Sequence, residues 1–213
     1  MMRDLIAAFD AAALERMPGG WRRHRGGGLF TLNLGDGFAA WLGLNSATQH
    51  HPLQINPVVG LRYDPLERLV ADLTARKSDP SITTLSSPIG YLTPQNAFLQ
   101  LEVTAAEDVL PAVDRLVGLM ELYGLPYARR HTSLDMLLAA LQEGGNVANP
   151  DRTKLLIPAL LFLTGAHEQA EYTLQQGCDH YGDDLAILVV RQYREFAHAL
   201  KRRMDDDMNG SCA

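Results

Sequence analysis

The hydrophobic pattern of this chain changes period near Thr104, and this change constrains the fold more than any other feature. Before Thr104, apolar and polar residues alternate in short segments, as half-buried strands require. Residues 53–63 show the clearest alternation. After Thr104, apolar residues recur at the spacing of amphipathic helices as far as Met204. A run of strands followed by a run of helices predicts an α+β fold.

We expect an N-terminal helix over residues 3–17 and an antiparallel meander of four or five strands. The strands are expected at residues 21–25, 29–34, 38–45, 53–63 and 98–103, and residues 78–96 should contain at most a short strand near 82–85. Gly35-Asp36-Gly37 predicts a hairpin turn between two of them. Pro57 cannot donate to a β-ladder, so the strand that contains it should lie at an edge or carry a bulge.

The domain organisation follows from the same change of period. Residues 1–124 should form a sheet-containing α+β region, and residues 125–204 a helical region that packs on it. Residues 205–213 are expected to form a disordered tail. Within the first region, Asp64-Pro65-Leu66-Glu67 predicts a helix start, with an N-cap acid and a proline at the first helical position.

The net charge of −6 is unevenly placed. Residues 1–104 hold nine Lys and Arg and nine Asp and Glu, whereas residues 105–213 hold ten and sixteen. An acidic half repels nucleic-acid phosphates and attracts basic partners. We therefore expect a basic protein partner and no nucleic-acid binding.

The chain carries no sequence feature of a membrane or secreted protein. It has no apolar run of the ~20 residues that a membrane-spanning helix needs. Asp4, Asp10 and Glu15 interrupt the stretch in which a secretory signal would be apolar. Cys178 and Cys212 are too few for a disulfide framework, which favours reduced thiols. These features predict a cytoplasmic protein that does not bind membranes.

A search for catalytic, nucleotide and metal motifs finds no specific one. The glycines of residues 26–28 precede a strand instead of a helix, so they predict a turn and not a phosphate site. His50 and His51 are adjacent, so in an extended chain their side chains point to opposite sides and cannot bind the same metal ion. Cys178 and His180 have a suitable spacing, but no second pair of metal ligands accompanies them. We predict no cofactor and no metal at these four residues.

The polar side of the predicted strands is the strongest candidate site. Its side chains are Thr31, Asn33, Asn45, Gln54, Asn56, Arg62, Gln100 and Glu102. This face is either simply solvated or a recognition surface with Trp41 as its aromatic anchor. The predicted partner-binding residues are Trp41, Asn45, Gln54, Asn56 and Arg62, together with the acidic pair Asp183 and Asp184.

Two resemblances to known families follow from this pattern. Residues 160–177, LLFLTGAHEQAEYTLQQG, resemble one helical hairpin of a tetratricopeptide-type repeat, with Gly165 at the turn and Ala170 at the close helix contact. The size, acidity, N-terminal helix, meander and helical C-terminal region together resemble the cytoplasmic immunity proteins of bacterial polymorphic-toxin systems. This resemblance is architectural, so it implies toxin neutralisation but assigns no functional residue.

The sequence is therefore compatible with three functions. The first is a non-enzymatic binding module, of the immunity or antitoxin kind, that occludes a basic partner. The second is a small hydrolase or transferase that uses His50 or His51 with Arg62 or Glu102 beside the sheet. The third is a secretion or assembly chaperone that uses its helical half as an adaptor. A homo-oligomer could form through an edge strand.

Overall fold

The computed structural model describes residues 2–47, 51–145 and 150–210, and the chain divides into two compact units. We call them the sheet unit, residues 1–63 and 81–133, and the helical unit, residues 64–80 and 134–213. The predicted α+β class, with an N-terminal helix, an antiparallel sheet and a helical C-terminal region, is confirmed. In the second half of the chain the division between the units falls after Ser133, and residues 64–80 also belong to the helical unit.

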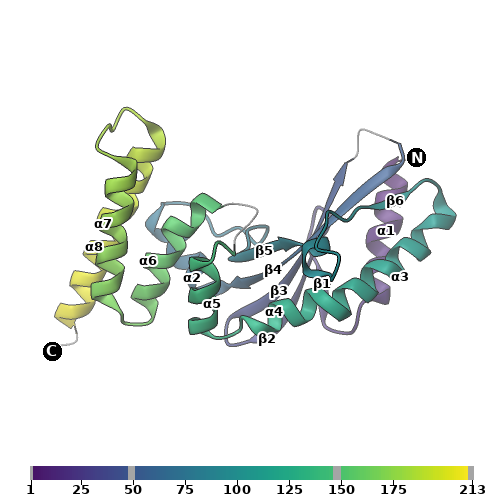
Figure 1. Ribbon diagram of the computed structural model, residues 1–213, viewed down its shortest axis with the longest axis horizontal. Helices are drawn as coiled ribbons and strands as arrows, with labels where there is room; N and C mark the ends of the chain where they lie inside the picture. Colours follow the sequence, from purple (N-terminus) through teal and green to yellow (C-terminus); the bar gives the residue numbers. More distant parts are fainter. Residues whose placement is uncertain (1, 48–50, 146–149, 211–213) are drawn as a thin grey trace. The chain divides into compact units, whose positions relative to one another are not determined.

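The sheet of the sheet unit is an antiparallel meander of six strands, not four or five (Figure 1). Five strands pair in chain order: β1 (Trp21–Arg23), β2 (Leu29–Gly35), β3 (Phe38–Ala47), β4 (Leu53–Tyr63) and β5 (Leu85–Pro88). The short strand β6 (Leu101–Val103) also pairs with β4. Two short strands thus share the outer side of one long strand.

Pro57 is accommodated differently from the expectation. The strand β4 is neither an edge nor bulged, because it pairs with β3 in continuous register on one side and with β5 and β6 on the other. On that outer side, β5 pairs with Val58–Leu61 and β6 with Leu53–Ile55. Pro57 lies in the gap between these two ladders, where the outer side of β4 makes no strand pairing.

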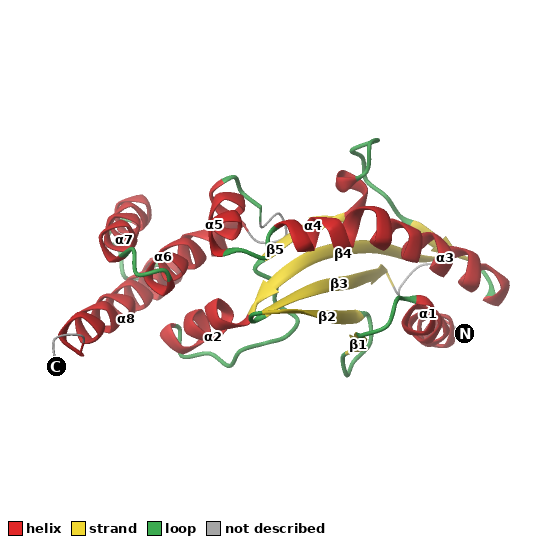
Figure 2. Ribbon diagram, turned by 90° about the horizontal axis from the view of Figure 1, so that it is seen from below, coloured by secondary structure: helices red, strands yellow, loops and turns green. Residues whose placement is uncertain are grey.

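The helices of the sheet unit pack on one face of the sheet. They are α1 (Met2–Arg16) and a long helical segment made of α3 (Val109–Leu119), the π-helical turn η3 (Met120–Gly124) and α4 (Leu125–Arg130). This segment crosses the sheet in Figure 2. Two shorter 3₁₀ turns, η1 (Ile89–Leu92) and η2 (Ala106–Asp108), belong to the connections. A Cβ on Gly124 would lie 3.0 Å from Val59 Cγ1, so the segment approaches β4 closely there.

The two faces of the sheet differ in burial. Phe30, Leu42 and Val59, which face the helices, are 0% exposed. Side chains of the opposite parity lie on what we call the open face, where Asn45 and Ala47 are exposed. The alternation in burial follows these two faces from Leu53 to Asn56, whereas residues 57–62 of β4 are buried on both faces.

The helical unit consists of five α-helices and one short turn in the part of the chain that is described. They are α2 (Asp64–Leu73), α5 (Leu134–Gln142), η4 (Pro150–Arg152), α6 (Thr153–Leu163), α7 (His167–Tyr181) and α8 (Leu188–Gly210). The helix α8 includes residues 205–210, which the sequence analysis had assigned to a disordered tail; residues 211–213 lie outside the described residues. Among the described helices, none is both long and apolar enough to cross a membrane.

Tyr127 on α4 gives the sheet unit a dependence on alkaline pH. Burial raises the pKa of its phenol to about 12. In the unfolded chain the phenol loses its proton at about pH 10. Between these two values the unfolded state binds fewer protons than the folded state, so stability falls as the pH rises.

We therefore expect the unfolding free energy to drop by about 2 kcal/mol between pH 9 and 11.5 because of this one group. Denaturant unfolding of the wild type and of Tyr127→Phe at both pH values measures it. The drop should be smaller in the variant, and an identical drop in both proteins would show that the phenol is not responsible.

Candidate functional site

Four carboxamide side chains meet at one end of the open face. Asn45, Gln54, Asn56 and Gln100, which we call the carboxamide cluster, line one hollow of about 760 Å³. The other lining residues are Ile6, Gly26, Gly27, Gly28, Leu44, Ser46 and Ala47. The hollow is wide open to solvent, so it suits contact with the surface of another molecule rather than enclosure of a small ligand. None of the described residues that line the hollow has an ionisable side chain.

The strand register explains why these residues meet. Asn45 on β3 pairs directly with Asn56 on β4. Gln54 pairs with Glu102 on β6, and the same register places Gln100 opposite Asn56. Because alternate residues of a strand share a face, these side chains form two adjacent rows across the sheet. One row is Asn45, Asn56 and Gln100, and the next contains Gln54 and Glu102.

Within this cluster, Asn56 occupies the central position. Its side-chain oxygen Oδ1 is buried and has no hydrogen-bond partner among the described residues. A buried acceptor without a donor costs about 1–3 kcal/mol. Gln100 Nε2 donates to Glu102 Oε1 at 3.3 Å, so this amide group is engaged as a donor and the Gln100 oxygen keeps its capacity to accept. The site therefore offers both amide donors and oxygen acceptors, with one buried acceptor, Asn56 Oδ1, to which no described residue donates.

The turn of residues 26–28, the glycine loop, forms one wall of the hollow and is held by α1. Asp10 on α1 is 2% exposed, and its Oδ2 accepts hydrogen bonds from Arg23 Nη2 and from the Gly28 N–H, both at 2.9 Å. A Cβ on Gly27 would lie only 2.6 Å from the same oxygen, and φ is +79° there. Gly28 O in turn accepts from Leu44 N at 2.6 Å. One buried carboxylate thus fixes the loop.

Asp10→Ala is expected to lower the unfolding free energy by about 2 kcal/mol. The change leaves the Gly28 N–H without its acceptor and removes the ion pair with Arg23, whose side chain is 38% exposed and regains water. Denaturant unfolding measures the loss. The matched control is Asp114→Ala, which breaks the exposed pair of Asp114 and Arg16 and should cost less than about 1 kcal/mol. Equal costs for the two variants would contradict this role of Asp10.

Trp41 lies on the open face beside the cluster and is half-buried. Its indole ring lies over Gly43, because the ring atoms Cη2 and Cζ3 occupy the space that a Cβ at Gly43 would need. Asn45 lies on the same face, two residues after Gly43 and four residues after Trp41. The open face therefore presents an aromatic ring next to a polar hollow, the mixture found at the centre of many protein interfaces.

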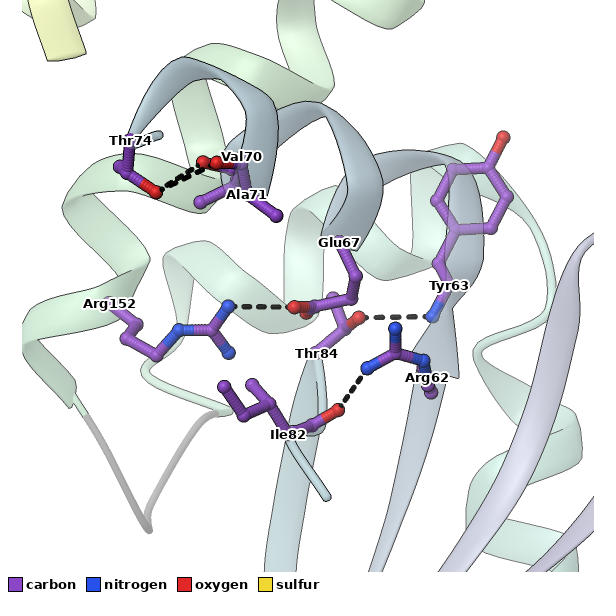
Figure 3. Close-up of polar contacts among 9 residues, drawn as sticks. All are labelled: Arg62, Tyr63, Glu67, Val70, Ala71, Thr74, Ile82, Thr84 and Arg152. Atoms are coloured by element: carbon purple, nitrogen blue, oxygen red, sulfur yellow. Dashed lines mark hydrogen bonds and ion pairs between the residues drawn. The ribbon is translucent and has the colours of Figure 1, made fainter. Parts of the chain in front are cut away.

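Arg62, in contrast, does not belong to this surface. It is 6% exposed, and its Nη1 donates to the backbone oxygen of Ile82 at 2.6 Å (Figure 3). The segment before β5 covers this end of the strand, since Thr84 N donates to Leu61 O and Tyr63 N donates to Thr84 Oγ1. The expectation that Arg62 lies on an accessible polar face is thus corrected. It lies six residues from Asn56 along β4, or about 20 Å.

The predicted acidic pair belongs to the other unit. Asp183 is exposed and forms an ion pair with Arg194. Asp184 Oδ1 accepts a hydrogen bond from Ala186 N at 3.0 Å. Both lie in the connection between α7 and α8. The sheet unit holds nine basic and nine acidic residues, whereas the helical unit holds ten and sixteen, so the net charge of −6 resides in the helical unit.

The candidate metal and catalytic residues are spread over both units. His51 is exposed, and His50 lies outside the described residues. In the helical unit, Cys178 is 6% exposed, and His180 stands edge-on to Tyr181. The described residues contain no group of three His, Cys, Asp or Glu side chains that could hold a metal ion. Of the partners considered for the histidines, Arg62 lies at the far end of β4, about 30 Å from the end that His51 precedes.

Sequence reasoning missed the glycine loop and Asp10 as parts of this site. It identified the loop as a turn, and positive φ values at Gly26, Gly27 and Gly28 agree with that. It had no signal that the loop would face the carboxamides, because that contact depends on the β2–β3 register. Asp10 is the one acidic residue on the buried face of α1, next to Phe9. A buried carboxylate needs a hydrogen-bond or charge partner, and this was the only sign in the sequence that Asp10 would have one.

No known protein family matches this chain, and neither a curated protein nor a solved structure shows significant similarity to it.

Proposed function

We propose that this protein is a non-enzymatic binding module that recognises a partner protein through the open face of its sheet unit. One observation carries the proposal: the open face ends in a hollow lined by four carboxamides and by no ionisable side chain among the described residues. Amide groups donate and accept hydrogen bonds but do not transfer protons near neutral pH, so such a lining suits recognition better than acid–base catalysis.

The partner is expected to be basic. The helical unit carries the whole net charge of −6 and would accelerate the approach of a basic protein, while the neutral sheet unit supplies the short-range contacts. By the architectural resemblance, the function is that of an immunity or antitoxin-like protein, which occludes a toxin in the bacterial cytoplasm. Chaperone or adaptor activity of the helical unit is the second candidate, favoured by the hairpin of α6 and α7 around Gly165.

The experiment is affinity capture from the native host with the wild type and with Trp41→Ala, followed by mass spectrometry. A stoichiometric partner that the wild type retains and the variant loses supports the proposal. If the partner is retained equally by both proteins, the open face is not the binding surface.

The enzyme alternative has its own test. His50→Ala and His51→Ala should each leave partner affinity and biological function unchanged. Loss of function in either variant, with partner affinity intact, would replace the binding proposal by the hydrolase or transferase one.

A further inference from the structure

The carboxamide cluster and Glu102 together carry one net negative charge and, besides the amide donors, a set of side-chain oxygens that can accept hydrogen bonds. Glu102 is exposed on the open face and pairs in register with Gln54. Among the described residues, no Lys, Arg or His side chain forms an ion pair with Glu102. The central acceptor, Asn56 Oδ1, is likewise without a donor. Within the described part of the chain, Asn56 Oδ1 therefore lacks a hydrogen-bond donor, and Glu102, which accepts one hydrogen bond from Gln100 Nε2, lacks a positive counter-charge.

The spacing of these acceptors suits a planar group with several N–H donors. Asn45, Asn56 and Gln100 lie in one row, in which neighbouring strands are about 4.8 Å apart. Glu102 lies diagonally from Asn56, at about 7–8 Å between Cα atoms, within reach of a glutamate side chain. A guanidinium carries five N–H donors in a fixed plane, whereas an ammonium is a compact charge that cannot span two rows.

We infer that the carboxamide cluster and Glu102 bind an arginine side chain of the partner. The inference rests on the proposed function and names the chemistry at that same site. The guanidinium supplies the donor that Asn56 Oδ1 lacks and pairs with the Glu102 carboxylate, while the neighbouring carboxamide oxygens accept its remaining N–H groups. The lining of the hollow is itself neutral, so binding a cation there depends on the carboxylate of Glu102, which pairs in register with Gln54 beside the hollow.

The test uses the full ¹⁵N-labelled chain and a small probe, N-acetyl-arginine N-methylamide. The side-chain amide signals of Asn45 and Asn56 report binding by nuclear magnetic resonance. The arginine probe should shift these signals in a saturable way. The citrulline analogue, which is neutral but similar in shape, should not, and the lysine analogue should bind more weakly.

Glu102→Gln tests the charge and keeps the shape of an exposed side chain, so the fold is retained. It should weaken binding of the arginine probe about fivefold. The matched control is Glu107→Gln, which changes an exposed glutamate of the same unit outside the cluster and should leave the affinity unchanged. The inference is overturned by equal responses to arginine and citrulline, by equal responses to arginine and lysine, by unchanged affinity in Glu102→Gln, or by no shift at all.

The outcomes separate this inference from the proposed function. If a captured partner is lost from Trp41→Ala but binds Glu102→Gln as tightly as the wild type, the open face is the interface and the arginine inference alone is wrong. If no partner depends on the open face, the proposed function is wrong, whatever the probe shows.

Discussion

Replacing Arg152 with methionine is expected to lower the unfolding free energy of the helical unit by about 3–5 kcal/mol. Arg152 precedes α6, and its Nη2 donates to Glu67 Oε2 on α2 at 2.7 Å (Figure 3). Glu67 is 4% exposed, and the Arg152 side chain is 17% exposed. Removing the guanidinium takes one positive charge and one hydrogen bond from a buried carboxylate, and the cost of burying that carboxylate then weighs more heavily against the folded state.

Two further variants isolate the buried pair. Lys201→Met breaks the ion pair between Lys201 and Glu171, whose side chains are 39% and 65% exposed, and should cost less than about 1 kcal/mol. The double variant Glu67→Leu with Arg152→Met removes both charges and should recover most of the loss. Denaturant unfolding measures all three variants. A cost below about 1 kcal/mol for Arg152→Met alone would show that the pair does not hold α2 to the helical unit.

Trp41→Ala is expected to weaken partner binding about 30-fold, which corresponds to about 2 kcal/mol. The change removes the aromatic surface of the open face, and the effect should appear as faster dissociation with a nearly constant association rate. Surface plasmon resonance with the captured partner separates the two rates. Unchanged dissociation would exclude Trp41 from the interface.

Gly43→Ala tests the same surface without removing the indole. A methyl group at Gly43 occupies the space of the ring and must displace it, so dissociation should again accelerate. The matched control is Gly118→Ala on α3, where a Cβ meets no atom within 4 Å and the rates should not change. Asp183→Asn with Asp184→Asn should instead slow association, and only at low salt.

The sheet was predictable because its signals are local. The alternation over residues 53–63 reports which side chains face the helices, and Gly35-Asp36-Gly37 forms the expected turn with φ values of 50° at Asp36 and 81° at Gly37. The same alternation placed Asn45, Gln54 and Asn56 on one face. Their meeting in one hollow follows from the register that the hairpin of β3 and β4 imposes.

The remaining features depend on contacts between distant parts of the chain. Arg62 shares its face with Asn56 and looked equally accessible, but the segment that covers it lies 20 residues later. Glu67 was identified only as part of a helix start, since its partner Arg152 is 85 residues away. For the same reason, the sequence could not show that α2 belongs to the helical unit. Local periodicity carries no information about such pairs.

The central claim is that the open face of the sheet unit binds a protein partner. Amide chemical-shift mapping of the ¹⁵N-labelled chain with the captured partner tests it most directly. We expect the largest changes at Trp41, Asn45, Gln54 and Asn56, with Arg62 unaffected. Changes confined to the helical unit, with the open face unperturbed, would contradict the claim.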